Sequence, residues 1–211
     1  LAGRCQELVV LDGKGTEEDA SGILADGFWG KEEWWVSGVT VTEMPSVGIR
    51  LDAGRFHAEM IRLDQNQDLG VFAQGDHSAL FLNQVEVRGT RSTDGGAFGR
   101  GIEVQGGASL VAEGCVVVDN ADVGIYVTHA GTSVSLSNVE VRETRAASDG
   151  TGGMGIAVQG GAHLEAGGCR VEGNTEAGIR VNRDDTSVSL SNVVVRDTHP
   201  LDDGNWGRGI E

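Results

Sequence analysis

The sequence predicts an all-β solenoid, a parallel β-helix built from stacked coils of three short strands. First, a Gly followed by Ile or Val recurs with spacings of 22, 31, 23, 31, 23 and 31 residues. Second, apolar segments with a period of two follow each copy and are separated by Gly, Asn and Asp, which is typical of strands. Third, three segments fit in 23 residues, too few for the helix pair of an α-solenoid repeat, which needs about 33. The motif glycines are Gly48, Gly70, Gly101, Gly124, Gly155, Gly178 and Gly209.

Coils of about 23 and 31 residues therefore alternate, and stacking equal positions gives two inward apolar columns. The column on the first strand is Ile49, Val71, Ile102, Ile125, Ile156 and Ile179. The column on the third strand is Ile61, Val85, Cys115, Val139, Cys169 and Val193. Side chains that are β-branched or small suit a narrow core between parallel strands.

A sharp corner is predicted before each third strand, where Gly and Asn alternate at Gly114, Asn138, Gly168 and Asn192. These two residue types enter the left-handed region at the lowest cost. Met60 and Gln84 stand at the same position and depart from the rule.

Charged residues on the outward face of the third strand test this register. With coils about 4.8 Å apart, the predicted neighbours are Arg62 and Glu86, Asp64 and Arg88, Glu140 and Arg170, and Glu172 between Arg142 and Arg196. Each such pair contributes about 0.2–1 kcal/mol. We interpret these arginines as solvated ladder partners rather than substrate-binding groups.

The Gly-Ile-x-Val step and an Asn-x-(Asp/Glu)-x-Gly sequence before it, at Asn66, Asn120 and Asn174, carry a family resemblance. The chain resembles the right-handed parallel β-helix repeats of the pectate-lyase-like superfamily. It also resembles bacterial secreted or surface β-helix proteins without assigned activity. We expect a single domain, with a partial N-terminal coil at 1–21 and about seven full coils over 22–211, truncated at the C-terminus.

The resemblance directs attention to the outward face of the first strand, where enzymes of the superfamily usually act. Its amides, hydroxyls and aromatic rings suit sugars, which combine stacking faces with many hydroxyl groups. The candidate ligand-binding residues are Phe72, Gln74, Glu103, Gln105, Tyr126, Thr128, Gln159, Arg180 and Asn182, with Trp206 from a loop. The competing interpretation, which we favour, is a hydrated sheet face without a ligand.

Catalytic candidates are few. Asp184 and Asp185 follow Arg180, and Glu103 lies on the first-strand face. The Asn-Thr-Asp and Gly-His-Gly steps of the superfamily's hydrolases do not occur in the sequence. We therefore leave enzymatic activity open and favour its absence.

Three long loops of equal length precede alternate first strands, at 90–100, 144–154 and 198–208. Asp94, Asp149 and Asp203 in these loops could hold Ca²⁺, which requires six to eight oxygen ligands. No repeated Asp pattern supplies that density, so solvated turn acids are favoured and no cofactor is predicted.

Two cysteines, Cys115 and Cys169, share an inward column two coils apart. That separation of about 9.6 Å exceeds the roughly 7 Å limit for a disulfide, so both are expected to be buried, reduced thiols. The state of Cys5 is open. Trp29, Trp34 and Trp35 could form a sugar platform or cap the core, and packing is favoured.

The formal net charge of −16, with scattered arginines and only two lysines, argues against nucleic acid and anionic membrane surfaces as partners. No apolar run is long enough for a membrane span. The favoured function is a non-catalytic extracellular or cell-surface scaffold with weak binding of a polysaccharide or cell-surface glycan. One alternative is a polysaccharide-active lyase, hydrolase or epimerase using the first-strand face, and the other is a carbohydrate-binding module. Unpaired strand edges predict end-to-end self-association.

Overall fold

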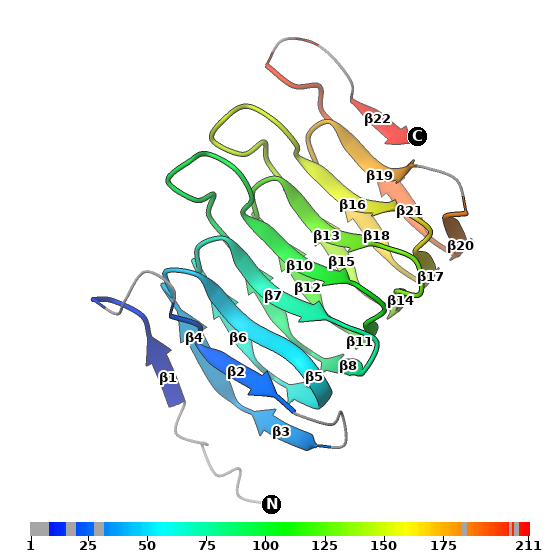
Figure 1. Ribbon diagram of the computed structural model, residues 1–211. Coiled ribbons are helices and arrows are strands. Elements are labelled where there is room, and N and C mark those ends of the chain that lie inside the picture. Colours follow the sequence, from blue (N-terminus) through cyan, green and yellow to red (C-terminus); the bar gives the residue numbers. More distant parts are fainter. Residues whose placement is uncertain (1–8, 16–19, 28–31, 183–184, 203, 205–206) are drawn as a thin grey trace, which may run out of the picture.

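The computed structural model describes residues 9–15, 20–27, 32–182, 185–202, 204 and 207–211. Each turn of the chain passes through three parallel sheets, which we call B, C and A in the order in which a turn visits them (Figure 1). Within the described residues, no helix is long and apolar enough to cross a membrane.

The strands divide among the sheets as follows. Sheet A contains β1 (Val9–Asp12), β4 (Val39–Thr42), β6 (Arg62–Asp64), β9 (Glu86–Arg88), β12 (Val116–Val118), β15 (Glu140–Arg142), β18 (Arg170–Glu172) and β21 (Val194–Arg196). Sheet B contains β2 (Ile23–Asp26), the start of β5 (Val47–Glu59), β7 (Leu69–Gln74), β10 (Arg100–Gln105), β13 (Val123–Thr128), β16 (Met154–Gln159), β19 (Ala177–Asn182) and β22 (Arg208–Ile210). Sheet C contains β3 (Glu33–Ser37), the end of β5, β8 (Ser78–Asn83), β11 (Ser109–Glu113), β14 (Ser133–Ser137), β17 (His163–Gly167) and β20 (Ser187–Ser191).

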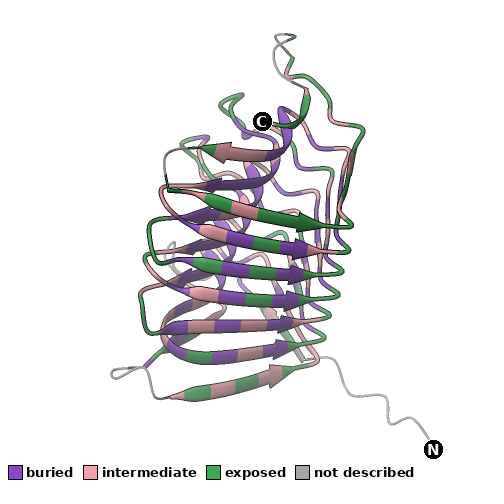
Figure 2. Ribbon diagram, turned by 90° about the vertical axis from the view of Figure 1, so that its right-hand side faces the viewer, coloured by how far each residue is buried: buried purple, intermediate pink, exposed green. Residues whose placement is uncertain are grey.

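Both predicted inward columns are confirmed. In sheet B, Ile102 pairs in register with Val71 on one side and Ile125 on the other, and all three are fully buried. Cys115 and Cys169, each directly before a strand of sheet A, are buried and free of disulfides, and burial raises the pKa of both thiols. Figure 2 looks onto sheet C and shows buried residues alternating with intermediate or exposed ones along β8, β11, β14 and β17.

The predicted corner also forms where its residue type does not favour it. Met60 and Gln84 adopt φ values of 52°, close to the 53° of Asn138 and the 60° of Gly114. Their backbone N–H groups continue the ladder, because Met60 N donates to Asn83 O at 3.0 Å. The hydrogen bond to the next coil therefore holds the left-handed conformation that the side chain alone would disfavour.

The motif glycine is required by close approach between coils. A Cβ added at Gly124 would lie 2.6 Å from the carbonyl oxygen of Gly155 and 2.6 Å from Val141 Cγ1. Real Cβ atoms do not approach other atoms so closely, hence a side chain here would force the coils apart.

The Asn of the Asn-x-(Asp/Glu)-x-Gly sequence is structural. Asn120 is fully buried, accepts a hydrogen bond from Thr90 N at 2.9 Å and donates to Val87 O at 3.2 Å. Asn66 and Asn174 make the equivalent pair of bonds. These side chains satisfy backbone groups inside the solenoid that would otherwise be buried without partners.

The charged ladder on sheet A is confirmed in part. Arg62 lies 2.8 Å from Glu86, and Arg88 lies 3.6 Å from Asp64. Arg196 lies 2.9 Å from Glu172, and this hydrogen bond is the main reason that the pKa of Glu172 is lowered.

The two remaining neighbour predictions are confirmed in the register, with Arg142 opposite Glu172 and Glu140 opposite Arg170, but among the described residues neither pair forms an ion pair. Arg142 turns away from Glu172 to Glu143, at 2.8 Å. Glu140 and Arg170 are neighbours in the register, yet among the described residues no ion pair joins them. Both side chains are at the solvent surface, where many rotamers compete and a register position does not fix a contact.

Candidate functional site: the outer faces of sheets B and C

The residues predicted to share the first-strand face lie side by side on sheet B. Glu103 stands between Phe72 and Tyr126 in the register. The second outward row is Gln74, Gln105, Thr128, Gln159 and Asn182. The face is therefore contiguous, as the Gly-Ile spacing predicts.

Arg100, which the sequence analysis did not select, is at the centre of this face. Its Nε donates to Asp122 Oδ2 and its Nη1 to Glu103 Oε2, both at 2.8 Å. The guanidinium carbon lies 4.1 Å from the ring centroid of Tyr126 and 4.9 Å from that of Phe98. Arg100 directly precedes the motif glycine at the start of β10, and counting outward positions from Gly-Ile leaves it out.

Burial controls the electrostatics of this cluster. Desolvation raises the pKa of Glu103, and the charge of Arg100 only partly offsets that rise. The pKa of Asp68 is also raised by burial. Desolvation acts to lower the pKa of Arg100, but Glu103 and Asp122 outweigh it and the net shift is upward. Arg100 thus stays charged and serves as the common partner of two carboxylates.

A second cluster lies toward the C-terminal end of the same face. Arg180 is 2.8 Å from Glu176 and 3.0 Å from Glu211, and burial raises the pKa of Glu176. Beside it is a hollow of about 220 Å³. Of the predicted ligand-binding residues, the hollow brings together Tyr126, Gln159, Arg180 and Asn182. Gln159 Nε2 donates to Tyr126 Oη, which fixes the amide against the ring.

At the other end of the face, the predicted stacking residue is covered. Phe72 is only 7% exposed and packs with Val47 and Leu69. Arg50 lies over its ring, 5.4 Å from the centroid, and is paired with Asp52 at 2.8 Å. The Phe72 ring is therefore part of the packing of sheet B.

The remaining catalytic candidates are not brought together. Asp185 is exposed in a turn after β19, three coils from Glu103. Asp184, Asp203 and Trp206 lie outside the described residues, as do Cys5 and Trp29.

The first two long loops stack on one another, as expected, and their candidate acids Asp94 and Asp149 are both engaged in hydrogen bonds. Ser148 N donates to Ser92 Oγ at 3.2 Å, which joins two loops that are two coils apart. Asp149 accepts from the backbone and hydroxyl of Thr151, and these bonds lower its pKa. Asp94 accepts from Gln67 Nε2 at 3.2 Å. In the part of the chain that the structure describes, no three His, Cys, Asp or Glu side chains gather as a metal site.

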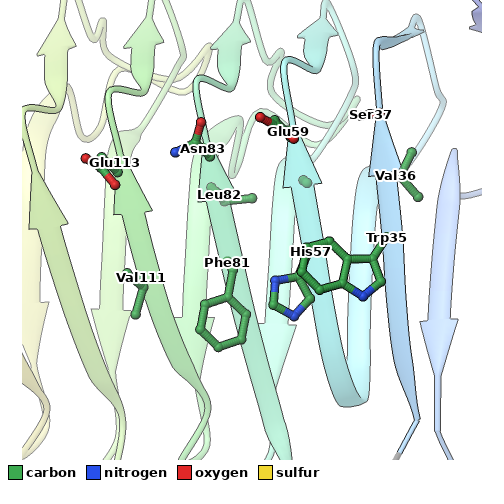
Figure 3. Close-up of a pocket in the computed structure, with 11 residues that line it drawn as sticks. Trp35, Val36, Ser37, His57, Glu59, Phe81, Leu82, Asn83, Val111 and Glu113 are labelled. Carbon is green, nitrogen blue, oxygen red and sulfur yellow. The ribbon is translucent and has the colours of Figure 1, made fainter.

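The outer face of sheet C carries a site that the sequence analysis did not assemble. Trp35, His57 and Phe81 stack with their ring planes within 5° (Figure 3). Ring centroids are 3.7 Å apart between Trp35 and His57, and 4.4 Å between His57 and Phe81. The signal was available, because the three residues occupy one register column, Trp35–His57–Phe81. It was missed because only the first and third strands were aligned on their outward positions.

The tryptophan cluster divides between inside and outside. Trp34 packs against the core, as the packing interpretation predicts. Its neighbour Trp35 points outward and is 73% exposed. The alternation of a strand explains the split, since successive side chains point to opposite faces.

A shallow hollow of about 410 Å³ lies along this aromatic stack. On the far side of the hollow is a polar row formed, in register order, by Ser37, Glu59, Asn83 and Glu113 (Figure 3). Val111 continues the apolar row by one coil beyond Phe81.

Comparison with solved structures agrees with the topology. A crystal structure of the pectate lyase Pel9A matches with a TM-score of 0.67 at 15% sequence identity, over 90% of this chain. The chain is a right-handed parallel β-helix. It spans 60% of the length of that lyase, and the likeness concerns the fold alone. The pentapeptide repeat protein HetL from a Nostoc cyanobacterium matches at 12% identity over 97% of this chain and 94% of HetL. Its TM-score of 0.28 is too low to indicate a shared fold. No protein-family model and no curated protein matches the chain.

Proposed function

We propose that this chain is a non-catalytic β-helix scaffold that works outside the cell or on the cell surface. One observation carries the proposal. Each described arginine on the outer face of sheet B is held by a carboxylate of the same face. The pairs are Arg50–Asp52, Arg100–Glu103, Arg100–Asp122, Arg180–Glu176, Arg180–Glu211 and Arg208–Glu211.

Such pairing favours a structural role for these groups. A general base must reach the proton that it removes and must be free to accept it. The guanidinium of Arg100 instead donates to two carboxylates and lies against the Tyr126 ring. The resemblance to secreted and surface β-helix proteins, together with the pectate-lyase-like fold, supports the proposed extracellular setting.

The second candidate is a polysaccharide-active enzyme, and the Glu103 environment is the observation that favours it. A carboxyl whose pKa is raised by burial suits a general acid. Glu103 is, however, only 6% exposed, which leaves little access for a glycosidic oxygen.

An assay of cleavage products tests the proposal. The full chain is incubated with neutral and acidic polysaccharides, with and without Ca²⁺, and both reducing ends and unsaturated products are measured. We expect no product above the level of a heat-inactivated sample. Product formation that Glu103→Gln abolishes, while Glu140→Gln on sheet A does not, would establish the enzyme and reject the scaffold.

A further inference from the structure

We propose that the outer face of sheet C binds a linear, uncharged glycan along the row Trp35, His57 and Phe81. This inference goes beyond the scaffold proposal, because it assigns a ligand class and a site on a different sheet from the one that the family resemblance points to.

The first argument is the exposure of the rings. Trp35 is 73% exposed and ends the stack, Phe81 is half-buried, and His57 lies between these two rings with 17% of its side chain exposed (Figure 3). His57 is held in this arrangement by Glu33, whose Oε1 lies 2.8 Å from His57 Nε2. Arg55 lies 5.1 Å from the Phe81 centroid and places guanidinium donors beside the stack. An exposed tryptophan that continues into a stack of half-buried rings forms an apolar surface patch, and such patches mark interaction sites.

The second argument is that the aromatic row is local. The same outward column continues along sheet C as Val111, Ser135, Glu165 and Ser189. The aromatic patch therefore ends where the column becomes polar, and it is not a general property of the sheet. If the fold required an aromatic ring at this position, every coil would carry one. The rings occur instead only on β3, β5 and β8 of this column.

The third argument is the match between two parallel rows and the chemistry of a sugar chain. Trp35 and Phe81, at the two ends of the stack, supply apolar ring surface, and the row containing Glu59, Asn83 and Glu113 supplies carboxylate and amide groups at the same coil spacing. A pyranose ring has an apolar face and hydroxyl groups at its edge. Stacking with a ring and hydrogen bonding to the neighbouring row can therefore occur together.

Charge selects an uncharged glycan over a polyuronate. Glu59 and Glu113 line the hollow, and the whole chain has a net charge of −16. An anionic chain laid beside these carboxylates would meet like charge, which disfavours its binding.

The dimensions fit an extended ligand. The rows cross four coils, from β3 to β11, which is about 14 Å at the spacing of strands in a sheet. The hollow of about 410 Å³ falls in the range of small-molecule sites. A stable protein partner would need an interface of about 1,000 Å² or more, larger than this patch.

Binding of defined oligosaccharides to the full chain tests the proposal. Cellohexaose, xylohexaose, mannohexaose and hexagalacturonate are titrated, with calorimetry and tryptophan fluorescence as readouts. We expect at least one neutral hexasaccharide to bind more tightly than hexagalacturonate. Trp35→Ala and Phe81→Ala should each weaken that binding by at least about tenfold, and Trp35→Phe should retain most of it. Leu24→Ala, which removes an exposed apolar side chain from sheet B, should leave binding unchanged.

Four outcomes would overturn the proposal. These are no binding of any neutral hexasaccharide, tighter binding of hexagalacturonate, and binding that Tyr126→Ala abolishes while Trp35→Ala does not. The fourth is a dimer of the chain that Trp35→Ala dissociates, because the occupant would then be a second copy. Circular dichroism of each variant is the control for folding. Release of cleavage products would reject only the scaffold proposal, so the two failures are distinguishable.

Discussion

The outer faces of sheets B and C belong to the same coils, yet their outward side chains differ in how far they are exposed to solvent. On sheet B, the central carboxylate is covered: Glu103 is 6% exposed and is bound by Arg100. On sheet C, the largest apolar side chain is open to solvent, with Trp35 73% exposed. A row of polar residues on a β-helix is therefore not by itself a binding face, since its charges can neutralise one another.

The connections beside each sheet account for the difference. Long loops precede alternate strands of sheet B, and one of them places Phe98 4.9 Å from the Arg100 guanidinium carbon. From β8 to β17, sheet C is bordered instead by tight turns, such as the one closed by Ala108 N donating to Gln105 O, and by single-residue corners such as Gly114. Turns of this length carry no side chains over the neighbouring sheet, so sheet C stays open.

The largest effect should come from removing the arginine at the centre of sheet B. Arg100→Ala leaves Glu103 and Asp122, whose side chains are 8% and 13% exposed, without their partner. An uncompensated buried charge costs about 3–5 kcal/mol, and we expect the free energy of unfolding in urea to fall by that order. Arg88→Ala, on the exposed ladder of sheet A, should cost less than about 1 kcal/mol. Equal losses in the two variants would contradict the view that sheet B is closed by its ion pairs.

Aromatic truncations sharpen the comparison between the sheets. Phe72→Ala on sheet B removes a covered ring that packs with Val47 and Leu69, and should lower the free energy of unfolding by about 3 kcal/mol. Trp35→Ala on sheet C removes only an exposed stack on His57, and should cost no more than about 1.5 kcal/mol. Thermal and urea unfolding measure both. A greater loss for Trp35→Ala would mean that the open stack is part of the fold.

The register of the fold was predictable because one residue type is forced. Gly124 cannot carry a side chain against Gly155 of the next coil, so the glycine reports the coil position directly. The corner at Met60 was not predictable from its residue type, since the left-handed φ there is held by a bond to Asn83 in the next coil. The residue type of Met60 indicates that a left-handed conformation is unfavourable there. It does not reveal the hydrogen bond to Asn83 that compensates for this cost.

The candidate sites were less predictable, for two reasons. Arg100 stands before the motif glycine, and its partner Asp122 comes from the next coil, so their meeting depends on side-chain direction as well as on register. Which of Trp34 and Trp35 points inward depends on the phase of β3, that is, on which alternate positions of this strand face the core. This phase could not be counted from a Gly-Ile motif, because β3 has none of its own. With that phase fixed, the pairing of Trp35 with His57 follows from the strand register.

The smallest predicted effect is a change in pH dependence that tests why sheet B is closed. Burial holds the pKa of Glu103 above its ordinary value of 4.5, so the folded chain binds this proton more tightly than the unfolded chain. The resulting stabilisation is fully present below pH 4.5 and is lost as pH rises through the raised pKa. Glu103→Gln removes this titration while its amide oxygen can still accept from Arg100, which also keeps Asp122. Urea unfolding between about pH 4 and pH 7 should therefore show a shallower decline in stability for Glu103→Gln than for the unaltered chain. Glu113→Gln, the same change at an exposed position of sheet C, should leave the slope as it was. Identical slopes in all three proteins would show that solvent reaches Glu103 and that the two faces differ less than their exposures indicate.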